Sequence, residues 1–154
     1  MTPTILALDI SSKMIGWCVL YAGTVESHGE HALKHDDINH RARLGRAAVA
    51  GIVALYPYLD CVAIEGPASP HKDSLIKQCF VSGAIRAYIA ELDIVICDVT
   101  PQHAKIALAG KGNAGKPEMQ IAALAYGVTG EHAADALGVA LWAAQRVRVM
   151  EVAA

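Results

Sequence analysis

Two carboxylates each follow an apolar run, in a position where they could do chemistry. Asp9 comes after Ile5–Leu8 within the stretch Thr4–Ile10, and Glu65 ends the stretch Cys61–Glu65. Apolar runs of this length, bounded by turn residues, predict buried strands. A buried carboxylate costs free energy unless a positive group meets it, and a hard divalent cation such as Mg²⁺ takes oxygen ligands. If the two strands are parallel neighbours, we expect both acids at one edge of the sheet, where open α/β sheets hold ligands.

A second pair of candidate ligands lies in the helix predicted over Glu131–Arg148. His132 and Asp135 are three residues apart, so they share one face of this helix. The predicted apolar stripe lies on its other side, at Leu137, Ala140, Leu141 and Ala144. Each residue alone also fits an ordinary structural role. Together, three carboxylates and an imidazole favour a site for two divalent ions, which clamp the attacking and leaving oxygens of a phosphoryl displacement.

The elements that must position these residues alternate between strands and helices. Strands are predicted at Thr4–Ile10, 16–21, 25–31, 61–65 and 94–99, and helices at 40–58, 74–92, 101–108, 117–126 and 131–148. We expect the first three strands to form an antiparallel meander. This order is that of the ribonuclease H-like fold, an α/β fold with a five-stranded mixed sheet flanked by helices, in one domain over 1–154. The first long helix has a predicted buried stripe at Leu44, Ala48, Ile52, Leu55 and Leu59.

Composition narrows the class of protein. The chain has 154 residues, 54% of them hydrophobic, which is enough for a folded core. The formal net charge of −2 argues against a nucleic-acid-binding protein whose surface is basic overall, so any DNA contact must come from a local basic patch. No apolar run reaches the roughly 18 residues of a membrane span, and the start lacks a signal-peptide pattern. The four cysteines stand far apart, which predicts reduced thiols in a cytoplasmic protein.

Five blocks of the sequence, taken in order, resemble the RuvC family of Holliday junction resolvases over nearly the whole chain. They are Leu8–Ser11 with Gly16-Trp17, Ala63–Glu65, Thr100-Pro101 with Ala104-Lys105, Gly110–Lys116, and His132–Leu137. The resemblance implies a homodimeric endonuclease that binds two Mg²⁺ ions per active site, with Mn²⁺ able to substitute. Such an enzyme nicks two opposed strands of a four-way DNA junction in a bacterial cell or a phage-infected host.

Carried over by position, Asp9, Glu65 and Asp135 are expected to be metal ligands in the active site. His132 stands where many members have a fourth acid, as a ligand or as a group that handles the proton of the attacking water. Lys105 and Lys116 resemble the family's active-site lysines, which are expected to neutralise the phosphate next to the cut and stabilise the transition state.

DNA binding is expected from Lys105, Lys111, Lys116 and Ser11. These lysines could equally be ordinary surface residues, but no acid occurs between Asp98 and Glu118, which favours contact with DNA. Arg41, Arg43 and Arg46, at the start of the first long helix, fit either a DNA arm or solvation of the helix. The dimer interface is expected along the alanine-rich second helix.

The sequence departs from the family after Glu65. Members of the family place an aromatic residue there that stacks at the opened junction, whereas Gly66–Pro70, including Ala68, has none, and Phe80 and Tyr88 lie deeper in the next helix. A less selective nuclease for branched DNA or RNA–DNA hybrids, and a non-catalytic junction-binding protein, therefore remain alternatives.

The sequence supports a nucleotide-binding site less well than a nuclease site. The G-x-G-x-x-G match at Gly110–Gly115 follows a predicted helix rather than a strand, and Pro117 replaces the Ser or Thr of a P-loop. An actin-like phosphotransferase would need a second domain.

Overall fold

The computed structural model describes the backbone of residues 3–153 and the side chains of residues 3–147. The strands are β1 (Thr4–Ile10), β2 (Met14–Tyr21), β3 (Thr24–Ala32), β4 (Cys61–Glu65) and β5 (Val95–Val99). The helices are α1 (Ile38–Leu55), α2 (Lys72–Glu91), α3 (Pro101–Ala109), α4 (Lys116–Leu124) and α5 (Glu131–Ala153). The sheet has the order β3-β2-β1-β4-β5, with β1, β2 and β3 antiparallel and β4 and β5 parallel to β1. The predicted mixed sheet and antiparallel meander are confirmed.

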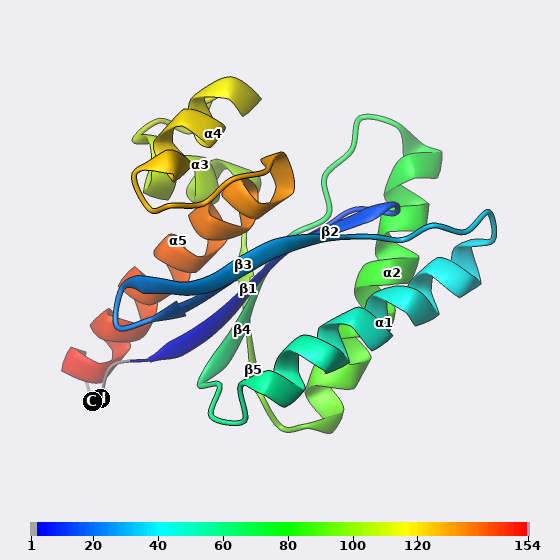
Figure 1. The fold of residues 1–154 in the computed structure, drawn as a ribbon, viewed down its shortest axis with the longest axis horizontal. Coiled ribbons are helices and arrows are strands. Elements are labelled where there is room, and N and C mark those ends of the chain that lie inside the picture. The colour runs from blue at the N-terminus through cyan, green and yellow to red at the C-terminus, as the bar shows by residue number, and fades with distance from the viewer. Residues whose placement is uncertain (1–2, 154) are drawn as a thin grey trace.

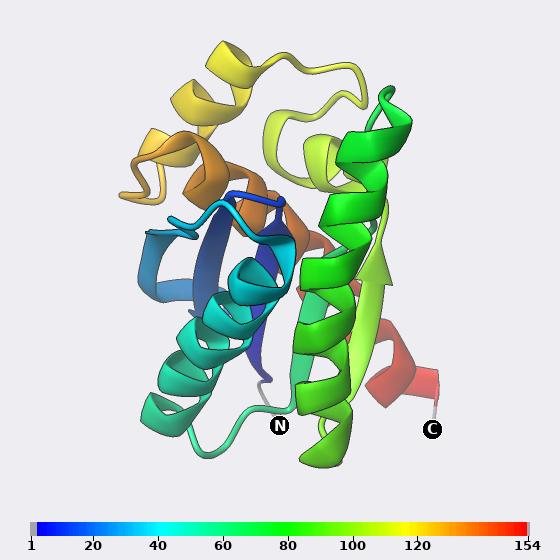
Figure 2. The same cartoon turned by 90° about the vertical axis from the view of Figure 1, so that its right-hand side faces the viewer.

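Helices cover both faces of this sheet. Helices α1 and α2 lie side by side on one face, and α5 crosses the other, with α3 and α4 beside its beginning (Figures 1 and 2). Side chains along a strand alternate between faces. In β1, Leu6 and Leu8 therefore join the core under α1 and α2, whereas Ile5 and Ala7 join the core under α5. By the same alternation Asp9 faces α5.

The predicted buried stripe of α1 is confirmed in part, because Ile52 is buried and Leu44 and Leu59 pack against the same core. Gly45, Val49 and Ile52 are buried, whereas Leu55 is 75% exposed. A Cβ on Gly45 would lie 3.0 Å from the Val81 side chain, so this glycine lets α2 approach closely. The prediction was wrong at Leu55, and it missed Gly45 and Val49, because the close contact with α2 buries these small residues.

Helix α5 is buried more completely than its predicted stripe required. Leu137 and Ala140 are fully buried as expected, but so are Ala133, Ala134 and Ala136, close to the candidate site. These small side chains allow the helix to lie against the sheet, so its first turns face protein rather than open solvent. None of the described helices is long and apolar enough to cross a membrane.

Candidate active site

The two strand-end acids lie on neighbouring parallel strands. Leu8 of β1 is in register with Ile64 of β4, so Asp9 and Glu65 follow at the same edge of the sheet. Ala63 packs under α5, and alternation places Glu65 on that same face. The pKa of Glu65 is raised to about 8, first because it is buried and then because the negative charges of Asp9 and Asp135 lie nearby. The structure thus brings together three predicted carboxylates.

The start of α5 adds the predicted histidine. His132 Nδ1 lies 2.7 Å from Asp9 Oδ2, and this hydrogen bond is the main reason that the pKa of His132 is raised. Burial, followed by the charge of Asp9, raises the pKa of Asp135 to about 6. The side chains are only partly accessible, with 27% of His132 and 16% of Asp9 exposed. The four residues therefore form a half-buried acidic cluster, defined here as Asp9, Glu65, His132 and Asp135.

A fourth carboxylate, Glu30 of β3, was missed by the sequence reasoning. Its Oε1 accepts hydrogen bonds from the backbone N–H groups of His132 at 2.8 Å and Ala133 at 3.3 Å. Glu30 thereby caps the beginning of α5, where backbone donors lack helical partners and negative charge is favoured. No local signal could have found it, because β3 is rich in polar residues and Glu30 lies 102 residues from His132.

Two glycines make this arrangement sterically possible. Gly16 of β2 pairs with both Asp9 and Glu30, so it lies between them in the sheet. A Cβ on Gly16 would lie 2.1 Å from the carbonyl oxygen of His132. Gly130 has a φ of 101°, and a Cβ there would lie 2.6 Å from Glu30 Oε1. Helix α5 can therefore start above β2 only because both positions lack a side chain.

The cluster has the donor chemistry of a cation site without being a closed cage. Among the described residues, no three His, Cys, Asp or Glu side chains are arranged to hold a metal ion as they stand. The carboxylates are nevertheless crowded enough to raise the pKa values of Glu65 and Asp135. Crowded, half-buried carboxylate oxygens are what a hard divalent cation binds, and a cation would relieve their mutual repulsion. The residues therefore fit such an ion, and their role as ligands stays a prediction.

The predicted lysines have different surroundings. Lys105 of α3 is close enough to Glu65 for its charge to oppose the rise in the pKa of that carboxyl, and it forms no ion pair within the described part of the chain. Lys111 instead forms an ion pair with Glu118, and Lys116 forms one with Glu131. Glu118 and Glu131 lie outside the interval between Asp98 and Glu118 that contains no acid. The lack of acids in that interval therefore did not predict which lysines form ion pairs.

The remaining predicted DNA contact, Ser11, has a structural role in this chain. Its Oγ donates to the carbonyl oxygen of Met14 at 3.0 Å and accepts from the Met14 N–H at 2.9 Å, which closes the turn between β1 and β2.

The glycine-rich loop begins at Gly110, which ends α3 with a φ of 78°. The loop thus follows a helix, as predicted.

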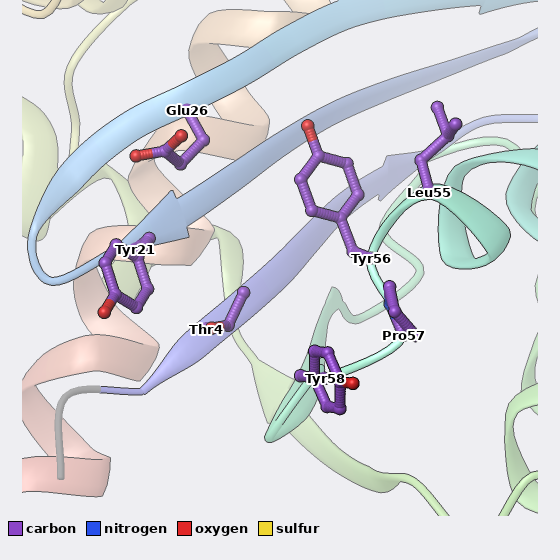
Figure 3. Close-up of a pocket in the computed structure, with 7 residues that line it drawn as sticks. All are labelled: Thr4, Tyr21, Glu26, Leu55, Tyr56, Pro57 and Tyr58. Atoms are coloured by element: carbon purple, nitrogen blue, oxygen red, sulfur yellow. The ribbon is translucent and has the colours of Figure 1, made fainter.

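A separate cleft lies at the other end of the sheet, beside the beginning of β1. It has a volume of about 370 Å³, and Figure 3 shows the seven residues that line it, with Tyr21, Tyr56 and Tyr58 around Thr4. The Tyr56 hydroxyl lies 2.6 Å from the Ser27 hydroxyl. The mainly apolar lining contrasts with the acidic cluster, so phosphodiester chemistry is expected only at the latter.

Comparison with known proteins points to one family. No family model matches the chain. A curated relative named crossover junction endodeoxyribonuclease RuvC, from Janthinobacterium sp. (strain Marseille), is 29% identical, with 89% of this chain and 81% of the relative covered. Two solved structures of Thermus thermophilus RuvC, one in complex with a Holliday junction substrate, are each 21% identical, with TM-scores of 0.78 and 0.79 and 96% of both chains covered. These findings confirm the predicted resemblance to RuvC and the ribonuclease H-like fold class.

Proposed function

We propose that this chain, which resembles RuvC, is an endonuclease that resolves four-way DNA junctions by paired nicks through metal-assisted hydrolysis of phosphodiester bonds. The observation that carries the proposal is the acidic cluster, in which residues from β1, β4 and α5 meet at one edge of the sheet. The curated relative named as a crossover junction endodeoxyribonuclease, and the structural likeness over 96% of the chain, support the same activity.

Asp9, Glu65 and Asp135, with His132, are the residues that would hold the divalent cations, which we propose to be two Mg²⁺ ions replaceable by Mn²⁺. When bound, such ions supply an activated water and neutralise the charge that develops on the attacking and leaving oxygens. Carboxylate oxygens suit Mg²⁺ and Mn²⁺, and neutral imidazole can join them.

The chain's own side chains would do the remaining work. His132 Nδ1 shares a hydrogen bond with Asp9 Oδ2 at 2.7 Å, so Asp9 would orient the ring and leave Nε2 to take or return a proton. Lys105 offers positive charge next to Glu65, where it would stabilise the phosphate in the transition state. Lys116 would reach the phosphate only after leaving Glu131, and Lys111 only after leaving Glu118.

We propose that the active form is a homodimer joined along α2, because two opposed nicks require two active sites. The outward side of α2 supports this interface. It carries Ile76, 43% exposed, and Phe80, 51% exposed, and continues through small residues at Gly83 and Ala87. An apolar and small-residue face of this kind suits packing against the same helix of a second copy.

We place the protein in the cytoplasm. Its four cysteines are unpaired, and burial raises the pKa values of Cys18 and Cys61 to about 12, which keeps these thiols protonated. Reduced thiols are what the reducing cytoplasm maintains.

The deciding experiment incubates a synthetic four-way junction with the protein and Mg²⁺ and maps the nicks on all four strands. Paired nicks on opposed strands, absent with EDTA, are expected. Asp9→Asn should abolish cleavage while junction binding persists, and Asp60→Asn, in the turn before β4 at the opposite end of the sheet from Asp9, serves as the control. Cleavage at the normal rate by Asp9→Asn would reject the assignment of the site, and binding without cleavage by the wild type would indicate a non-catalytic junction-binding protein.

One observation favours a second candidate, a less selective nuclease. The segment Gly66–Pro70 after β4 contains no aromatic side chain, and Pro67 to Ala68 lie exposed beside the acidic cluster. Nothing in this segment therefore provides a stacking wedge for an opened junction. Cleavage rates measured on four-way junctions, flaps and RNA–DNA hybrids discriminate the two, because equal rates on all three favour the less selective enzyme.

A further inference from the structure

Basic side chains surround a hollow beside the acidic cluster, on the side of the sheet covered by α1 and α2. Five residues line it: Ser12 and Lys13 from the turn after β1, Arg41 from α1, and Ser74 and Lys77 from the first turns of α2. The hollow has a volume of about 350 Å³. We call these five residues and the space between them the basic hollow. Three cations and two hydroxyl groups are the donors that recognise phosphate.

The cations of the basic hollow are not neutralised by carboxylates. The Arg41 guanidinium is held by backbone carbonyl oxygens, those of His35 and, at 3.5 Å, of Ser12. Within the described side chains, Lys13 and Lys77 form no ion pair, in contrast to Arg46, which pairs with Glu91. An arginine anchored in this way keeps other guanidinium N–H groups available for a bidentate contact with phosphate.

The positive region continues into an adjoining hollow of about 550 Å³. Lys13 and Arg41 line both spaces, and the second space adds Lys34, His35 and Asp36 along with Leu33. Asp36 is the one carboxylate lining it, against three cations. The two hollows share Lys13 and Arg41, and together they are lined by four cations, Lys13, Lys34, Arg41 and Lys77.

The basic hollow and the acidic cluster are connected through neighbouring residues of α2 and β1. Gln78, the residue after Lys77, donates from Nε2 to the carbonyl oxygen of Ile10 at 2.7 Å. Ile10 in turn follows Asp9, so the first turns of α2 are held against the strand that carries this carboxylate. A strand that passes through the acidic cluster and leaves toward α1 and α2 would therefore cross the basic hollow.

We propose that the basic hollow binds a backbone phosphate of the DNA arm that leaves the acidic cluster on the side of α1 and α2. This inference rests on the proposed function and adds to it a location for the arm. Lys13, Arg41 and Lys77 supply the charge, and the hydroxyl groups of Ser12 and Ser74 supply neutral donors. These residues position DNA and are not catalytic.

The first test measures junction affinity in EDTA as a function of salt. In Lys13→Ala/Lys77→Ala, we expect the slope of log K for junction binding against log salt to fall in magnitude by about 0.9, the contribution of one phosphate contact, and the Kd at 0.1 M salt to rise roughly tenfold. Arg43→Ala is the matched control, because this exposed arginine lies on α1 two residues from Arg41 and lines neither hollow. It should leave the slope unchanged.

The second test neutralises the DNA instead of the protein. Single methylphosphonate linkages are placed in turn along each arm near the cut. At one position the methylphosphonate is expected to weaken junction binding by the wild type but not by Lys13→Ala/Lys77→Ala. The two changes are then not additive, because each removes the same contact between lysine and phosphate. The inference would be overturned by an unchanged salt slope in the double variant, by an equal loss of junction affinity in Arg43→Ala, or by the absence of a methylphosphonate position with this behaviour. Cleavage by the wild type would in each case leave the proposed function intact. Failure of the wild type to bind branched DNA would instead reject the proposed function, and this inference with it.

Discussion

The backbone N–H of His132 donates to Oε1 of Glu30 at 2.8 Å, so a carboxylate on β3 holds the start of the helix that carries half of the acidic cluster. The ring of the same histidine meets Asp9 at 2.7 Å. Residues of β1 and β3 thus fix the backbone and the side chain of His132 from two sides. Gly16 of β2 lies between them and leaves the space that His132 fills.

Removing this cap should loosen the site more than it weakens the fold. Glu30→Ala takes away the acceptor of two N–H groups, so we expect the free energy of unfolding to fall by about 1–2 kcal/mol. The rate of cleavage at saturating DNA should fall roughly tenfold, because small misplacements of an active-site group lower the rate steeply. Urea unfolding and single-turnover cleavage measure the two effects. Glu26→Ala, on the same strand, is the control. If both variants cleave equally well, the cap has no part in positioning His132.

Filling the space at Gly16 should be far more costly than adding the same methyl group elsewhere. In Gly16→Ala the new Cβ would lie 2.1 Å from a backbone oxygen that cannot move without shifting α5. We expect the free energy of unfolding to fall by about 3 kcal/mol, at the upper end for overpacking. Gly51→Ala is the matched control, because it lies in α1 with nothing within 4 Å of its Cβ position. In Gly51→Ala the free energy of unfolding should rise by about 0.5–1 kcal/mol, since alanine has a higher helix propensity than glycine.

Thermal unfolding of both variants in one buffer provides the measurement. Equal melting temperatures would mean that α5 can move away from β2 without cost.

The sequence predicted the acids of the site because each carried a local signal. Asp9 and Glu65 break apolar runs, and His132 and Asp135 share a helix face. Glu30 has no such signal, because its role arises from the pairing of three strands and from where α5 begins. The lysine partners were equally inaccessible, since the pairing of Lys111 with Glu118 depends on how the loop between α3 and α4 closes.

The fold was predicted better than the contacts that refine it. The mixed α/β sheet and its antiparallel meander followed from the succession of strands and helices. The burial of Gly45 in α1 did not follow, since it depends on the approach of Val81 from α2. Contacts between elements distant in sequence therefore limit what periodicity alone can predict.

The metal-free protein should lose stability as pH rises, and Glu65 should be a main cause. Its pKa is about 8 in the folded chain against an ordinary value of 4.5. Between these values the unfolded state is ionised while the folded state keeps its proton, so unfolding becomes easier as pH increases. The contribution is fully present below pH 4.5 and is lost as pH passes through about 8.

Glu65→Gln should remove this dependence. In EDTA at pH 8 we expect its free energy of unfolding to exceed that of the wild type by about 2 kcal/mol. One pKa unit corresponds to about 1.4 kcal/mol, and relaxation of the neighbouring groups reduces the full effect of the shift. The same variant should lose Mg²⁺-dependent cleavage and the stabilisation by Mg²⁺ that the wild type gains by mass action. Glu91→Gln, an exposed acid at the end of α2, is the control. A variant less stable than the wild type at pH 8 in EDTA would show that Glu65 is not destabilised by its surroundings.

The surroundings of the lysines predict that they contribute unequally to cleavage. Lys105 acts on Glu65 and has no carboxylate partner among the described residues, whereas Lys111 is held by Glu118. Lys105→Ala should therefore lower the single-turnover rate by about 10²-fold, as expected for a group that stabilises transition-state charge. Lys111→Ala should change the rate by less than about tenfold and act mainly on affinity, through its phosphate contact. Lys105→Arg, which keeps the charge, should recover part of the rate. Equal losses in Lys105→Ala and Lys111→Ala would show that the ion pair with Glu118 opens in the complex and that both lysines reach the DNA.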